Sequence, residues 1–172
     1  IARPEVPLWT MRNGYAMCTE VGLEAIGAYL AALDASALDD LRGKLRIGVN
    51  RDVEVTDSGL VPRPVVSQAF CSALPVSFSQ IPHRLWRRFA CLILEAAYEA
   101  TLLAAVENAR RGSSNVVLLT RLGGGAFGND GDWIDGAIGR ALDLSAGFDL
   151  DVRLVSYGAH FSATAALMRR FQ

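Results

Sequence analysis

The sequence predicts a three-layer α/β domain, in which helices cover both faces of a sheet. Two observations lead to this prediction. Apolar residues recur at three- and four-residue spacing in several segments, which is typical of helices, and β-branched apolar runs alternate with those segments. Strands that alternate with helices are typical of layered α/β domains. A chain of 172 residues, 51% of them hydrophobic, is long enough to bury one full core, so we expect a single domain.

Residues 1–44 are predicted to form a mainly helical N-terminal part. The proline-rich segment 1–17 is expected to be irregular. A helix is predicted over 20–33, because Thr19 is a suitable N-cap residue. A short second helix is predicted at Ser36, which begins a capping-box spacing, and it should end at Gly43.

Residues 45–172 are predicted to contain the sheet and the ligand loop. The longest helix is expected over 83–108, with an apolar stripe that faces the sheet. A β-α-β unit should follow, and Ser162 should begin a terminal helix. The predicted strands, of which the second and third are expected to be buried, span 45–55, 65–73, 116–120 and 151–156.

The composition disfavours several classes of partner. With 17 Lys and Arg against 18 Asp and Glu, the formal net charge is -1, so no broad positive field attracts nucleic acid or an anionic membrane. No segment is predicted to span a bilayer. We therefore expect neither nucleic-acid nor membrane partners. Because the chain begins at Ile1, we also expect it to be an excerpt of a longer chain or a processed product.

The cysteines indicate a reducing compartment. Cys18, Cys71 and Cys91 are odd in number and widely spaced, which favours free thiols over a disulfide framework. The two histidines are not near a cysteine pair, so no metal site is predicted. We expect a cytoplasmic location, or a host cytosol if the protein is a secreted effector. The high alanine, leucine and arginine content is typical of GC-rich bacterial genomes.

The most informative motif is the glycine-rich run 123–129, which lies between an apolar strand and an amphipathic helix. Glycine allows the backbone to turn through positive φ and to approach an anion closely. Successive N–H groups and the N-terminus of the next helix then supply positive potential without a lysine. The motif therefore predicts a phosphorylated ligand, and the alternative is a tight strand-to-helix turn that binds nothing.

Two other kinds of phosphate-binding loop, the Rossmann loop and the Walker A loop, are also rich in glycine. Gly123, Gly125 and Gly128 satisfy the G-x-G-x-x-G pattern of a dinucleotide-binding Rossmann unit. Too little chain follows for the rest of that unit, no acidic residue ends the next strand, and residues 129–132 delay the helix. A Walker A loop is excluded because no Lys-Ser or Lys-Thr pair follows the glycines.

The amino-acid sequence of the loop and its surroundings resembles the diphosphate-binding loop of the macrodomain superfamily. It is most similar to the branch of poly(ADP-ribose) glycohydrolases and bacterial ADP-ribosylarginine hydrolases, where G-x-G-A-F-G occupies this place. The resemblance extends over 45–158 and is carried by Leu119–Asn129, Trp133-Ile134, Ala137-Ile138, Val66–Pro75, Ala97–Leu102 and Asp151–Gly158. Nothing in this chain matches the upstream glycine-rich segment with paired glutamates of that branch, so no catalytic residue is carried over from it.

The resemblance implies a macrodomain-like α/β/α fold with a mixed central sheet over 1–172. It also implies that the protein binds ADP-ribose and hydrolyses ADP-ribosyl groups from modified protein, with arginine as the expected linkage, and without a metal or other cofactor. Phe127 would lie against a ribose or base, and Asn129 beside a hydroxyl. The residues implied to hold the ligand are Gly123, Gly124, Gly125, Ala126, Phe127, Gly128 and Asn129.

Cleavage of an N-glycosidic bond to arginine builds oxocarbenium character, which carboxylates can stabilise, and carboxylates can also position ribose hydroxyls or activate water. The candidates are Asp52 and Glu54, on one face of a predicted strand, and Asp57, where that strand enters a loop. A solvated edge-strand face explains the same residues. Two functional alternatives therefore remain beside hydrolysis: a non-catalytic reader of ADP-ribosylated protein, and a Rossmann-type NAD(P)-dependent oxidoreductase.

Overall fold

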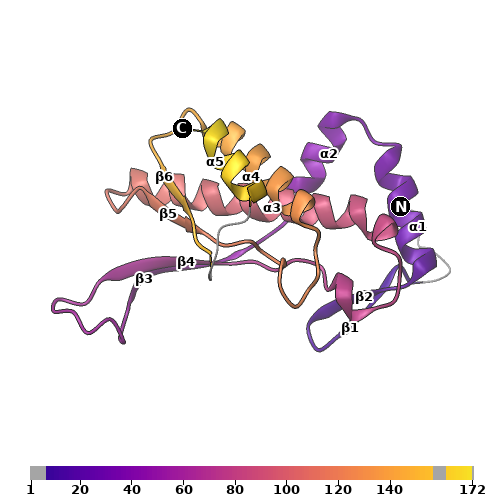
Figure 1. The fold of residues 1–172 in the computed structure, drawn as a ribbon, viewed down its shortest axis with the longest axis horizontal. Helices are drawn as coiled ribbons and strands as arrows, with labels where there is room; N and C mark the ends of the chain where they lie inside the picture. The colour runs from indigo at the N-terminus through magenta and orange to yellow at the C-terminus, as the bar shows by residue number, and fades with distance from the viewer. Residues whose placement is uncertain (1–6, 157–161, 172) are drawn as a thin grey trace.

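The computed structural model describes residues 7–156 and 162–171, which form a mixed α and β structure arranged around one long helix (Figure 1). The helices are α1 (Glu20–Ala31), α2 (Ala35–Arg42), α3 (His83–Arg110), α4 (Gly131–Ser145) and α5 (Ser162–Arg170), with a 3-10 turn η1 (Val76–Phe78). The strands are β1 (Trp9–Arg12), β2 (Tyr15–Cys18), β3 (Gly48–Glu54), β4 (Val65–Phe70), β5 (Val116–Leu119) and β6 (Asp151–Leu154).

The first two helices lie where the sequence predicts them. The N-cap of α1 is Thr19, whose hydroxyl accepts a hydrogen bond from the N–H of Gly22 at 3.0 Å. The N-cap of α2 is Asp34, which accepts from the N–H of Ala37 at 2.8 Å, so the predicted capping box at Ser36 is wrong. An ionised carboxylate there also complements the positive end of the helix dipole.

The apolar stripe of α3 packs mainly against α1 and α4 rather than against a sheet, which corrects the prediction. Leu94 and Tyr98 of α3 lie in one buried apolar cluster with Ile134 and Ala137 of α4. Within the described residues, α3 is the one helix long and apolar enough to cross a membrane by length and composition. No membrane-spanning segment is predicted from the sequence. Buried core helices often have the same length and hydropathy as a membrane-spanning helix.

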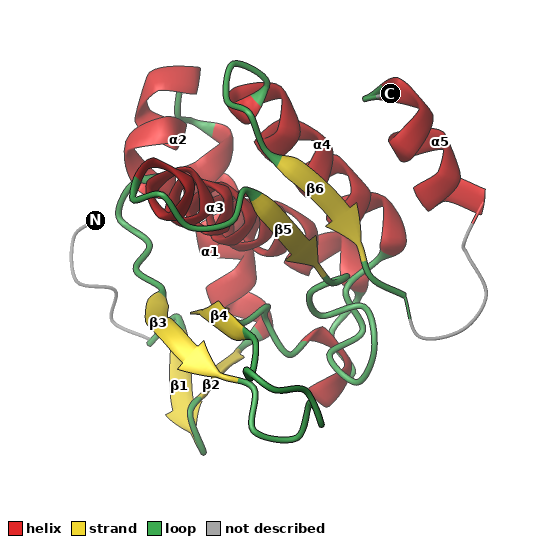
Figure 2. Cartoon of the chain, turned by 90° about the vertical axis from the view of Figure 1, so that its left-hand side faces the viewer, coloured by secondary structure: helices red, strands yellow, loops and turns green. Residues whose placement is uncertain are grey.

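Over residues 7–156 and 162–171, the six strands pair as three separate two-stranded sheets rather than as one mixed central sheet (Figure 2). β5 and β6 are parallel and are joined through α4, which confirms the predicted β-α-β unit. β3 and β4 form an antiparallel hairpin that is joined to the C-terminal end of α3 by the Arg51–Glu107 ion pair, and its turn end projects beyond the helices (Figure 1). Every residue of β4 is exposed, so its predicted burial is wrong. Its residues stay exposed although β4 touches the C-terminal end of α3, where the Ser67 hydroxyl donates to Asn108 Oδ1 at 3.1 Å.

The segment 9–18 forms a β-hairpin, although the sequence analysis predicted irregular structure there. β1 and β2 are joined by Asn13 and Gly14, with φ of 50° and 83°. A two-residue Asn-Gly loop with positive φ at both positions matches the right-handed twist of an antiparallel pair. The prolines upstream obscured this signal.

Candidate functional site

The glycine-rich loop lies at the carboxyl end of β5 and leads into the N-terminus of α4. Val117 and Leu119 of β5 are buried against the helices, which fixes the start of the loop. Gly124, Gly125 and Ala126 form its exposed tip. The carboxyl ends of parallel strands are where open α/β sheets place their ligands, so the loop occupies a suitable position.

Hydrogen bonds inside the loop leave three consecutive backbone donors available. The N–H of Asn129 donates to Gly123 O at 2.9 Å, and the N–H of Gly128 donates to Gly125 O at 3.0 Å. Within the described part of the chain, the N–H groups of Gly125, Ala126 and Phe127 have no acceptor. A run of unpaired N–H groups in a turn, next to a helix N-terminus, is a typical anion-binding arrangement.

Glycine is needed at different positions of the loop for different structural reasons. Gly123 has a φ of 74°, and a Cβ there would clash with Ala73 and Asn129. Gly128 has a φ of 67°, and a Cβ there would lie 2.7 Å from the Cβ of Ser77. Gly125 faces open space. The first and last glycines are therefore needed for the fold of the loop, whereas Gly125 leaves room above the free N–H groups.

The segment that precedes α3 supports the loop along its length. Asn129 is only 5% exposed, and its amide Nδ2 donates to Leu74 O at 2.9 Å and to Gly123 O at 3.3 Å. The N–H of Ser77 donates to Phe127 O at 3.0 Å, and its hydroxyl donates to Ala126 O. Asn129 thus holds the loop in place, and its expected contact with a ligand hydroxyl stays a prediction.

Tyr98 of α3 fixes the start of the loop, and Arg121 ties that start to α4. The Tyr98 hydroxyl donates to Thr120 O at 2.8 Å and accepts from the N–H of Leu122 at 2.7 Å, and burial raises its pKa to about 12. The hydroxyl therefore stays protonated at neutral pH. Arg121 forms an ion pair with Asp135 of α4 and donates to Gly131 O at 3.2 Å. The start of the loop is thereby tied to the helix that follows it.

Asp130 is the N-cap residue of α4, but its side chain makes no capping hydrogen bond. Its carboxylate instead lies 2.9 Å from Nδ1 of His83, the first residue of α3. Both side chains are about half exposed. The pair joins the beginnings of two helices and belongs to the same support of the loop.

The three predicted catalytic carboxylates lie on the β3–β4 hairpin, away from the loop (Figure 1). Asp52 forms an ion pair with Arg111 at 2.9 Å, and Glu54 with Arg63 at 3.3 Å. Glu54 is opposite Val65, five residues from the end of β4 nearest the loop. At about 3.3 Å per residue, that separation alone is roughly 16 Å. Asp57 lies farther still, in the turn that follows β3.

Three aromatic rings meet beside the loop. Phe127 contacts Tyr15 of β2 and Phe78 of η1, and these two also contact each other, each pair at a centroid distance of 5.5 Å. The sequence analysis predicted a role for Phe127 but missed Tyr15, Ser77 and Phe78. The Asn-Gly sequence is typical of a hairpin turn and could have predicted that Tyr15 lies in a hairpin. No local sequence pattern predicts that Ser77 contacts the loop.

Two hollows in the described structure lie elsewhere. One, of about 410 Å³, is lined at the C-terminal end of α3 by residues including Arg110 and Phe148. The other, of about 370 Å³, is mostly apolar and lies between α4, β6 and α5. Neither hollow is lined by residues of the glycine-rich loop, whose tip is exposed to solvent. The described residues also contain no cluster of His, Cys, Asp or Glu able to hold a metal ion.

No family model matches the chain, and no curated protein or solved structure is significantly similar to it. The macrodomain resemblance therefore stays a prediction from the loop sequence and its surroundings. The features that bear on function are the geometry of the loop, its support by segment 74–83, and the residues around it.

Proposed function

We propose that this protein binds ADP-ribose, free or attached to another protein, through its glycine-rich loop. The observation that carries the proposal is the run of three unpaired N–H groups at Gly125, Ala126 and Phe127 beneath open space. A pyrophosphate offers several oxygens that can accept from such a run. The N-terminus of α4 adds favourable electrostatic potential.

The macrodomain-like fold is part of the same proposal. Its support is the order of β5, loop, α4 and β6, with β5 and β6 parallel, together with the loop sequence. The macrodomain resemblance is the basis for proposing ADP-ribose as the nucleotide. The unpaired N–H groups of the loop are the basis for proposing an anion site. A Rossmann-type site would instead favour NAD, so the two ligands are compared in the test.

Binding without turnover is the function that the geometry supports best. Asp52 and Glu54 are ion-paired on a hairpin that projects away from the loop. A carboxylate that stabilises an oxocarbenium ion must lie beside the ribose. Hydrolysis of ADP-ribosyl arginine, the activity that the resemblance implies, needs these groups to approach the ligand.

Calorimetric titration with ADP-ribose and, in parallel, NAD tests the proposal. We expect micromolar binding of ADP-ribose and little binding of NAD. Gly125→Glu should abolish binding, because a carboxylate would occupy the space over the free N–H groups. Gly125→Ala is the matched control and should fold and melt like the wild type. Equal binding by wild type and Gly125→Glu would contradict the proposal.

The catalytic prediction has its own assay on an arginine-linked ADP-ribosylated protein. Release of ADP-ribose that is lost in Asp52→Asn, with binding retained, would support Asp52 as a catalytic residue and the protein as a hydrolase. Binding without release would support the reader function. Release that is unaffected in Asp52→Asn would contradict the predicted role of that carboxylate.

A further inference from the structure

We propose that Tyr15 and Phe78, together with Phe127, form an aromatic platform on which the base of the bound nucleotide stacks. The inference rests on the proposed function and extends it, because it assigns a base-binding site to residues outside the glycine-rich loop. It also places the β1–β2 hairpin, which lies outside the region of macrodomain resemblance, in the ligand site.

Local structure explains why Tyr15 reaches the loop. The Asn13-Gly14 turn pairs Arg12 with Tyr15, so Tyr15 is the first residue of the returning strand. Trp9, at the other end of the hairpin, stacks on Phe89 of α3 with a centroid distance of 5.9 Å. The hairpin is thus anchored on α3, and its turn end reaches the loop.

The three rings come from three different elements and meet at nearly right angles. The interplanar angles are 81° for Tyr15 with Phe78, 80° for Tyr15 with Phe127 and 86° for Phe78 with Phe127. Edge-to-face contacts at such distances are favourable, so the rings hold one another in fixed orientations. A fixed ring loses little conformational entropy when a ligand stacks on it.

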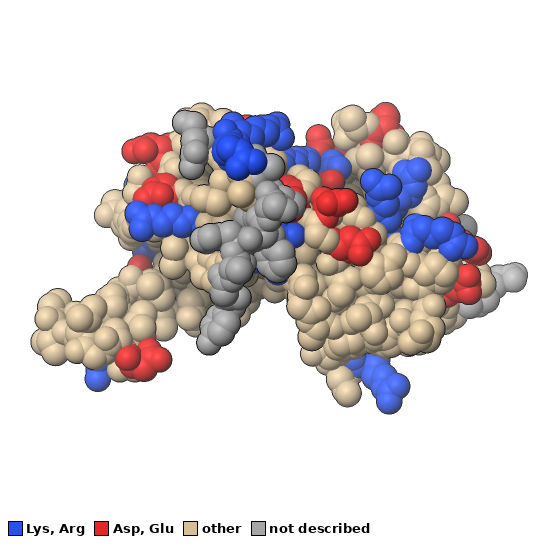
Figure 3. All heavy atoms as spheres, viewed as in Figure 1, with Lys and Arg blue, Asp and Glu red and all other residues tan. Residues whose placement is uncertain are grey.

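Much of this aromatic surface faces solvent. Tyr15 is 36% exposed and Phe78 is 44% exposed. Figure 3 shows that the surface over β1, β2 and η1 carries few charged side chains. Exposed aromatic rings that gather in one place commonly mark a binding site rather than simple packing.

The platform begins where the anion site ends. Phe127 contributes the last of the three unpaired N–H groups and also one of the three rings. A ligand whose phosphates meet the loop therefore has flat aromatic side chains within reach of the next part of the molecule. A nucleoside diphosphate has this chemistry, because its charged groups and its planar base are joined by one sugar. Stacking of the base on the rings is tolerant of base identity.

The test compares ligands with and without a base by calorimetry. In Tyr15→Leu/Phe78→Leu, we expect affinity for ADP-ribose and ADP to fall about tenfold or more, the effect of losing base-stacking side chains. Affinity for ribose 5-phosphate and pyrophosphate should change less than twofold. Tyr29→Leu is the matched control, because Tyr29 is a comparably exposed tyrosine on α1. It should bind all four ligands like the wild type.

The outcomes separate this inference from the proposed function. If wild type binds ADP-ribose and the double variant binds it equally well, the platform is wrong and the loop proposal stands. If the double variant loses affinity for all four ligands alike, the rings only support the loop, and the inference is overturned. If wild type binds none of them, the proposed function itself fails. The single variant Tyr15→Phe, which keeps the ring and removes the hydroxyl, should retain ADP affinity, and a loss of affinity there would contradict stacking on the ring.

Discussion

At the scale of single residues, the glycines of one short loop serve two separate purposes. Gly123 and Gly128 have positive φ and are crowded by neighbouring atoms, so they are required by the backbone itself. Gly125 is crowded by nothing and has no positive φ, so its value lies in the space that it leaves. Sequence alone treats these residues as equivalent, because a glycine code does not reveal its φ or its neighbours.

This difference predicts opposite results for two alanine substitutions. Gly123→Ala should lower the free energy of unfolding by about 2–4 kcal/mol, because it combines a left-handed backbone with a clash against Ala73. Gly125→Ala should change it by about 0.5 kcal/mol or less. Urea unfolding followed by circular dichroism measures both. Similar stabilities for the two variants would contradict the assignment.

At the scale of elements, periodic patterns predicted the helices well and the strand environments poorly. The predicted helix starts at Glu20, His83 and Ser162 coincide with those observed, since capping residues and apolar spacing are local signals. The burial of β4 could not be predicted, because it depends on which elements cover a strand. The hairpin at Asn13-Gly14 could have been predicted from its turn sequence.

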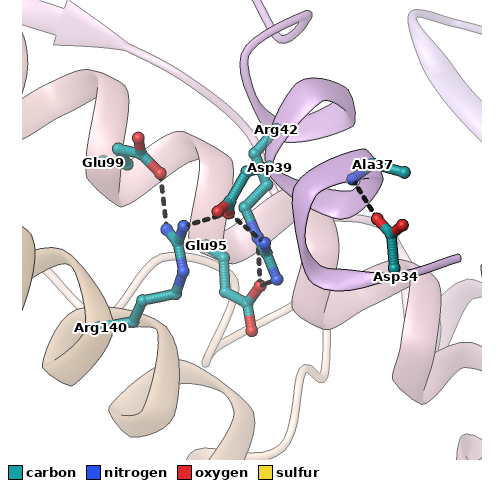
Figure 4. Close-up of polar contacts among 7 residues, drawn as sticks. All are labelled: Asp34, Ala37, Asp39, Arg42, Glu95, Glu99 and Arg140. Carbon is teal, nitrogen blue, oxygen red and sulfur yellow. Dashed lines mark hydrogen bonds and ion pairs between the residues drawn. The ribbon is translucent and has the colours of Figure 1, made fainter.

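An ion-pair network fastens α2 to the two longest helices (Figure 4). Arg140 of α4 contacts Glu99 of α3 at 2.6 Å and Asp39 of α2 at 2.8 Å. Arg42 of α2 contacts Asp39 at 2.6 Å and Glu95 of α3 at 2.6 Å. No residue of α2 is fully buried, and these ion pairs join it to α3 and α4.

The network predicts a pH-dependent contribution to stability. The hydrogen bond from Arg42, followed by the charge of Arg140, holds the pKa of Asp39 below its ordinary value. A depressed carboxyl pKa stabilises the fold above the ordinary value near 4, and this contribution is lost as pH falls through the folded pKa. Asp39→Asn should therefore lower the melting temperature at pH 6, and the difference from the wild type should shrink as the pH falls below 4. A difference that persists unchanged at pH 2.5 would contradict this.

At the scale of the whole molecule, the strands of the described residues do not close into one sheet. β4 and β5 both contact α3, yet within the described part of the chain each is paired on one side only. Leu118 of β5 is 65% exposed and Phe70 of β4 is 56% exposed. An apolar strand with an unpaired edge can pair with another chain. The helical core and the loop could be predicted from local sequence, whereas this open arrangement depends on long-range pairing that no local pattern encodes.

The open edges predict association at high protein concentration. Leu118→Lys should reduce it, because a charge beside an unpaired edge opposes strand pairing. Light scattering coupled to gel filtration measures the effect. The matched control is Leu144→Lys, which removes an exposed leucine from a helix instead. A wild type that stays monomeric at millimolar concentration, or an equal effect of both variants, would contradict the prediction.

The tight support of the glycine-rich loop has a kinetic consequence. Contacts from Leu74, Ser77, His83 and Tyr98 hold the loop in its form before any ligand arrives. A preformed site spends little of its interaction energy on ordering itself. Encounter with the ligand then needs no slow rearrangement, so differences in affinity among ligands should arise from how long each one stays bound.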